Sequence, residues 1–83
     1  MSENILFTRS AFKHGYSSKD ISRAIETKIC EGLLKEENEI YVIVGFDTVA
    51  NPIEIFYNYI DDTTIKVFHV MALSERIRNQ LGL

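Results

Sequence analysis

The stretch EIYVIVGF, residues 39–46, decides the fold of this chain. Its apolar side chains run without interruption through the middle, at Val42, Ile43 and Val44. β-Branched residues favour an extended backbone, and a continuous apolar run of this length is typical of a strand covered on both faces. We therefore expect residues 39–46 to form a strand inside a sheet, with the middle of the strand covered on both faces.

Further strands on either side of this one follow from a period of two. The four predicted strands cover residues 28–35, 39–46, 53–60 and 63–71. Their connections are too short for parallel crossovers, so we expect a four-stranded antiparallel meander. If residues 61–62 form a two-residue hairpin loop, Glu54 lies directly opposite His69. A four-residue loop would place Glu54 opposite Met71 and leave His69 on the diagonal. Both loops put Glu54 and His69 on the same face of the sheet.

Helices are predicted outside the sheet, where cap residues precede apolar residues at helical spacing. They run from Thr8 to about Lys13, from Ser17 to about Thr27, and from Ser74 to about Leu81. Gly15 suits the left-handed position that ends the first helix, and Ser17 with Asp20 suits a capping box. The predicted fold class is α+β, with two short N-terminal helices, the antiparallel sheet and a C-terminal helix. We expect the helices to pack on one face of the sheet.

Length and composition indicate one small domain, residues 1–83. The chain has 46% hydrophobic residues, a net charge of −3 and a single cysteine, Cys30, which suggests a thiol in a reducing compartment. No apolar run approaches the roughly 20 residues of a membrane span, and the first residues lack the features of a signal peptide. We therefore expect a cytoplasmic protein that does not enter a membrane.

The cations are unevenly distributed along the chain. Five lie within residues 9–28 and two near the C-terminus. The acidic total argues against a protein that coats nucleic acid regardless of sequence, but a local cluster of charge matters more for an enzyme that acts on RNA. The predicted RNA-contacting cations are Arg9, Lys19, Arg23, Arg76 and Arg78.

His14 and His69 are the only histidines and the main chemical signal. Cleavage of RNA without a metal needs a base for the 2′-hydroxyl proton, an acid for the leaving 5′-oxygen and a cation for the charged phosphorane. Histidine suits both proton transfers because it gains and loses a proton near neutral pH. The predicted catalytic residues are His14 and His69, with Glu54 orienting His69 and Lys13 stabilising the phosphate charge.

A purely structural explanation stays open for both histidines. His69 can be a partly buried residue held by Glu54, and His14 can be a helix C-terminal residue favoured by the helix dipole. The two histidines and Cys30 match no metal-binding spacing, and the chain has no glycine-rich phosphate loop. We expect neither a metal nor a cofactor.

Short motifs within residues 12–73 resemble those of the BrnT family of small bacterial toxins. In chain order they are Lys13-His14-Gly15, Asp20-Ile21, Gly45-Phe46-Asp47, Glu54 and His69-Val70-Met71. The chain departs from the family pattern at residues 72–74, which lack the arginine that relatives often carry there. Its acidic net charge is a second departure.

The resemblance implies a RelE-like ribonuclease fold and the toxin of a type II toxin–antitoxin system. Such a toxin is a metal-independent endoribonuclease that inhibits translation and growth until a cognate antitoxin neutralises it. The implied partners are the antitoxin and RNA, which could be ribosome-bound mRNA. The alternative is a non-catalytic protein-interaction module on the same scaffold.

Overall fold

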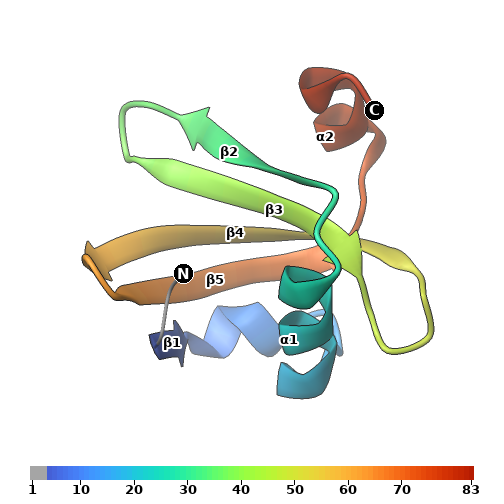
Figure 1. The fold of residues 1–83 in the computed structure, drawn as a ribbon, viewed down its shortest axis with the longest axis horizontal. Helices are drawn as coiled ribbons and strands as arrows, with labels where there is room; N and C mark the ends of the chain where they lie inside the picture. The colour runs from blue at the N-terminus through green and yellow to red at the C-terminus, as the bar shows by residue number, and fades with distance from the viewer. Residues whose placement is uncertain (1–3) are drawn as a thin grey trace.

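The computed structural model describes residues 4–83, which form one five-stranded sheet with helices on both faces (Figure 1). The strands are β1 (Asn4–Phe7), β2 (Cys30–Lys35), β3 (Ile40–Phe46), β4 (Pro52–Asp61) and β5 (Thr64–Ala72). The helices are the 3-10 helix η1 (Arg9–Phe12), α1 (Ser18–Glu26) and α2 (Glu75–Leu81). The strand order is β1-β5-β4-β3-β2. The α+β class is confirmed.

Strands β2 to β5 form the antiparallel meander that the short connections predict. The prediction of four strands, all antiparallel, is nevertheless wrong. Residues 4–7 add a fifth strand, β1, which pairs in parallel with the outer edge of β5. The argument from short connections applies only to consecutive strands. Because β1 and β5 lie at opposite ends of the chain, the meander itself supplies the long connection that parallel pairing needs.

The two α-helices begin where their cap residues predict. Ser17 Oγ accepts a hydrogen bond from the Asp20 N–H, and Asp20 Oδ2 accepts one from the Ser17 N–H, each at 3.1 Å. This reciprocal pair is the predicted capping box of α1. Ser74 caps α2 by accepting a hydrogen bond from the Ile77 N–H at 3.2 Å.

The first predicted helix, from Thr8 to about Lys13, is only the single 3-10 turn η1, so the prediction of two N-terminal α-helices is wrong. Thr8 lies at the N-cap position without capping the turn. Its hydroxyl contacts Ser10 Oγ at 2.8 Å and donates to the Val67 carbonyl of β5 at 3.4 Å. The cap residue therefore fastens the turn to the sheet instead of extending a helix. Gly15 has the left-handed backbone that was predicted, with a φ of 91°.

The two faces of the sheet carry different helices, which overturns the prediction that all helices pack on one face (Figure 1). On the α1 face, Ala11, Ile21 and Ala24 of η1 and α1 pack against the odd-numbered apolar residues of β3 and β4, such as Ile43 and Ile55. The α2 face holds a smaller cluster of Val42, Val44 and Ile77. The uninterrupted apolar run of β3 supplies side chains to both clusters, as expected of a strand covered on both faces.

Candidate functional site

Two β-bulges determine how β4 and β5 present their polar residues. Asp61 pairs with Thr64, so the hairpin loop is residues 62–63 and not 61–62. Ile60 is the extra residue on β4, and Phe68 is the extra residue on β5. The two one-residue shifts lie on opposite strands and cancel. Residues 53–56 of β4 therefore have the partners on β5 that the four-residue loop predicts.

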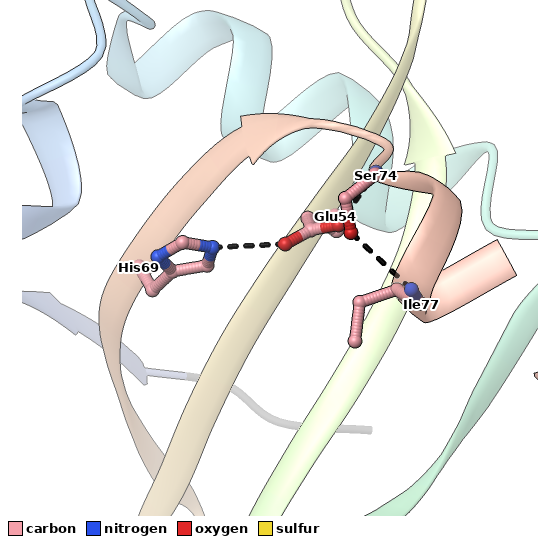
Figure 2. Close-up of polar contacts among 4 residues, drawn as sticks. All are labelled: Glu54, His69, Ser74 and Ile77. Carbon is pink, nitrogen blue, oxygen red and sulfur yellow. Dashed lines mark hydrogen bonds and ion pairs between the residues drawn. The ribbon is translucent and has the colours of Figure 1, made fainter. Parts of the chain in front are cut away.

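This register corrects the expected partner of Glu54. Glu54 lies opposite Met71, and His69 lies opposite Phe56, so the direct pairing of Glu54 with His69 is wrong. The diagonal arrangement still brings the two side chains together on the α2 face. His69 Nε2 lies 2.9 Å from Glu54 Oε2 (Figure 2). The shared face was predicted correctly, because a side chain as long as glutamate reaches a diagonal neighbour.

Glu54 is buried, and both of its carboxylate oxygens have partners. Its side chain is only 2% exposed, whereas that of His69 is 26% exposed. Glu54 Oε1 accepts a hydrogen bond from the Ser74 N–H at 2.8 Å, at the start of α2 (Figure 2). A buried carboxylate is costly unless it is fully hydrogen-bonded. The same carboxylate therefore fastens α2 to β4 and orients the His69 ring.

The hydrogen bond to Glu54 selects one form of the neutral His69 ring. A carboxylate only accepts hydrogen bonds, so the histidine nitrogen that faces Glu54 carries the proton. In neutral His69 this nitrogen is Nε2, and Nδ1 then keeps a free lone pair. Nδ1 lies on the side of the ring turned away from Glu54 (Figure 2). This arrangement equips His69 to accept a proton at Nδ1.

His14 lies beside His69, although the two residues are 55 positions apart in the sequence. Their ring centroids are 6.1 Å apart, and the rings are inclined at 75° in an edge-to-face arrangement. The turn η1 crosses the edge of β5 just beyond β1, where Ser10 Oγ donates to the Phe68 carbonyl at 2.6 Å. This contact with the bulged strand holds the segment that carries the exposed His14 beside β5.

Three residues of the site were missed by sequence reasoning. The Phe56 ring packs on His69 with centroids 4.3 Å apart, and Phe68 approaches Phe56 at 6.4 Å. The Ser74 N–H donates the hydrogen bond to the second carboxylate oxygen of Glu54. The period-two pattern signals that Phe56 and Glu54 share a face, but a regular strand would put Phe68 and His69 on opposite faces. Only the bulge turns both toward the same side.

The predicted RNA-contacting cations do not form one surface. Arg9 lies on η1 and Lys13 directly after it, both exposed. Lys19 and Arg23 belong to α1, where they line a hollow of about 420 Å³ with Glu26 and Thr48. Arg76 and Arg78 belong to α2, on the other face of the sheet. The structure thus groups His14, His69 and Glu54, with Lys13 next to His14 in the chain. It distributes the remaining predicted cations over three elements, η1, α1 and α2.

Comparisons with protein-family models, with curated proteins and with solved structures found no match for this chain. Within residues 4–83, no three histidine, cysteine, aspartate or glutamate side chains gather into a group that could hold a metal ion. In the same part of the chain, none of the helices has the length and apolar character needed to cross a membrane.

Proposed function

We propose that this protein is a metal-independent endoribonuclease, the toxin of a type II toxin–antitoxin pair. The observation that carries the proposal is the cluster of His14, His69 and Glu54, in which the imidazole rings lie 6.1 Å apart and Glu54 holds His69 at 2.9 Å. Two imidazoles that lie edge to face at this centroid separation can serve the two oxygens of one phosphodiester. The resemblance of short motifs in this chain to those of BrnT toxins supports the same function.

The reaction needs two proton transfers. His69 Nδ1 takes the proton of the RNA 2′-hydroxyl, whose oxygen attacks the adjacent phosphorus. Protonated His14 gives its proton to the leaving 5′-oxygen as the P–O bond breaks. The products are a 2′,3′-cyclic phosphate and a free 5′-hydroxyl, so atoms and charge balance with no metal or cofactor. Lys13, next to His14, offsets the charge that builds on the phosphorane.

The test is RNA cleavage by the purified protein, with and without ribosomes, beside growth inhibition after induced expression. We expect His14→Ala and His69→Ala each to lower the cleavage rate by about 10²–10⁴-fold, the usual cost of losing a general acid or base. Met71→Ala is the matched control, because it shortens a partly buried side chain on the same strand and face as His69. Wild-type cleavage rates in both histidine variants would exclude His14 and His69 as the proton-transfer pair.

A neutralising protein is the expected partner. We propose that its acidic segment covers the cations of residues 9–28, which would speed association through complementary charge. Association should therefore slow as salt is raised, and co-expression of the small protein encoded beside this one should restore growth. A gene with no such neighbour, together with a purified protein that carries no partner from its native host, would count against the toxin assignment.

The second candidate function is a protein-interaction module without catalytic activity. It is favoured by the burial of Glu54 and by its hydrogen bond to Ser74, because these contacts give Glu54 and His69 a role in fastening α2. Several large apolar side chains are also more than half exposed, namely Leu6, Ile29, Val49 and Ile60. Absence of cleavage by the wild-type protein in every assay above would select this function.

A further inference from the structure

A hollow on the α2 face is lined in part by Phe68, the residue before His69, and is not used by the mechanism above. It has a volume of about 410 Å³ and opens near the β4–β5 hairpin. It is lined by the polar or charged residues Thr8, Asn38, Glu39, Asn58 and Lys66 and by the apolar or aromatic residues Ile40, Tyr59, Ile60 and Phe68. Aromatic, cationic and amide side chains are the types that bind a nucleotide.

The bulge in β5 joins this hollow to the histidine site. Phe68 is the extra residue of the bulge, so Phe68 and His69 both lie opposite Phe56. The Phe56 ring contacts both of them, with centroids 6.4 Å from Phe68 and 4.3 Å from His69. Bulges frequently redirect side chains beside active sites. Here the bulge places an aromatic wall of the hollow and the proposed catalytic base in consecutive positions of one strand.

The charges around the hollow set the direction in which a nucleotide would lie. Lys66 on β5 belongs to one side of the hollow, and Glu39, directly before β3, belongs to the other. A phosphate is attracted to the β5 side and repelled by Glu39. The base then points toward Glu39, whose carboxylate can accept a hydrogen bond from an exocyclic amino group.

The wall near Glu39 is held in place before any ligand binds. Asn58 Nδ2 on β4 donates to the carbonyls of Asn38 and Glu39, each at 3.3 Å. These bonds tie the β2–β3 turn to the neighbouring hairpin. A wall that is already ordered loses less entropy on binding.

We propose that this hollow binds one unstacked base of a single-stranded RNA, with the base stacked on Phe68 and its phosphate at Lys66, next to the phosphodiester at His14 and His69. The proposal rests on the proposed ribonuclease function and names its substrate class. A base inside a duplex is stacked on both sides and cannot enter, so single-stranded RNA is the substrate.

The experiment measures binding separately from cleavage. The probe is a fluorescent single-stranded oligonucleotide of about eight nucleotides, a length within the range one small domain covers. Its riboses are 2′-O-methylated, so the attacking hydroxyl is absent and cleavage cannot occur. We expect Phe68→Ala to weaken binding by about fivefold or more, the effect of losing one stacked base, and Phe68→Tyr to retain it. Lys66→Gln should weaken binding and reduce the salt slope by about 0.7, the contribution of one phosphate on a single strand.

A variant on β2 that lies outside the hollow serves as the control. Leu33→Ala removes an exposed apolar side chain from β2, and it should bind as the wild type does. Circular dichroism verifies each fold. If Phe68→Ala does not fold, a 4-thiouridine probe crosslinked to the wild type replaces it, and crosslinks must map to residues 66–68.

The outcomes separate the two proposals. Binding that depends on Phe68, without cleavage of the unmodified RNA, supports the base site and refutes the ribonuclease. Cleavage that needs the histidines but is unaffected by Phe68→Ala supports the ribonuclease and overturns the base site. No binding by the wild type, or equal losses in Phe68→Ala and Leu33→Ala, also overturns it.

Discussion

The two faces of the sheet differ in what holds their helices. The α1 face buries ten residues in one apolar cluster, whereas the cluster under α2 has three. α1 is held by apolar contact, and its polar contacts to the rest of the chain lie at its two ends, where Asp20 bonds to Thr48 and the C-cap residue Thr27 bonds to the Phe46 backbone. α2 has one buried side chain, Ile77, and is held in addition by the buried carboxylate of Glu54. The comparison teaches that the α1 face carries the stability of the fold, which leaves polar side chains on the α2 face available for chemistry.

Gly45→Ala should produce the largest loss of stability, because it breaks the contact of α1 with β3. A Cβ at Gly45 would overlap the backbone carbonyl of Ala24, which cannot move aside as a flexible side chain can. We expect a loss of about 3 kcal/mol or more, at the upper end for overpacking. Gly32→Ala is the matched control, since a Cβ on β2 meets open space. Denaturant unfolding measures both, and equal midpoints would show that α1 does not need this close approach.

Glu54→Ala should have the next largest effect and should act on the α2 face. It leaves the Ser74 N–H without its acceptor and His69 without its carboxylate, which we expect to cost about 1–3 kcal/mol. Glu54→Gln keeps a carbonyl oxygen for Ser74, so the fold should lose little stability. Its amide can also donate to His69 Nε2 and thereby favour the other form of the ring. Cleavage should fall, but less than in His69→Ala.

The Glu54 variants are compared by thermal unfolding and by RNA cleavage measured on the same preparations. Loss of stability in both variants alike would assign Glu54 a role that depends on its charge rather than on hydrogen bonding. Loss of cleavage in neither variant would remove Glu54 from the proposed mechanism and leave it as the fastening of α2.

Sequence reasoning succeeded where the signal is local. Ser17 and Asp20 are three residues apart, and their capping box depends on nothing outside α1. The period of two likewise places β3 and β4, because each strand carries its own pattern. The pairing of Glu54 with His69 on one face was also predictable from parity, although the residues directly opposite each were not.

The rest could not be predicted because it depends on distant contacts. β1 is four residues long and is extended only because β5 offers an edge. The bulge at Phe68 follows from the register of a whole hairpin, and no residue pattern marks it. The nearness of His14 to His69 depends on that bulge and on the hydrogen bond of Ser10 to the Phe68 carbonyl. The side of the sheet that α2 covers depends on where Glu54 meets Ser74.

Tyr57→Phe should cost about 1 kcal/mol, the usual value of one hydrogen bond. Tyr57 is 1% exposed on the α1 face, and its hydroxyl donates to Glu31 Oε2 at 2.6 Å. Burial, and then the nearby Glu31 carboxylate, raise the pKa of Tyr57 above its usual value of 10.0. A raised pKa contributes stability below pH 10 that is lost as pH rises above it. The stability of the wild type, measured by denaturant unfolding, should therefore fall more steeply above pH 10 than that of Tyr57→Phe.

The smallest effect is expected at Asp20, the partly exposed counterpart of Glu54. Its Oδ1 accepts from Thr48 Oγ1 at 2.7 Å and from the Thr48 N–H at 3.0 Å, while Oδ2 serves the capping box with Ser17. These hydrogen bonds, that from the Thr48 hydroxyl first, lower the pKa of Asp20 well below its usual value of 3.8. A lowered pKa contributes stability above pH 3.8 that is lost as pH falls toward the folded-state value.

Asp20→Asn should therefore cost about 0.5–1 kcal/mol at neutral pH, the lower part of the range for capping contacts. The difference from the wild type should shrink as the pH falls below about 4, where the aspartate of the unfolded chain becomes protonated. Denaturant unfolding between pH 2 and 7, with Asp62→Asn in the exposed hairpin loop as control, measures the difference. A gap that stays constant with pH would mean that Asp20 acts through its shape alone. The partly exposed carboxylate of Asp20 is then worth less to α1 than the buried carboxylate of Glu54 is to α2, because water competes for the hydrogen bonds of Asp20.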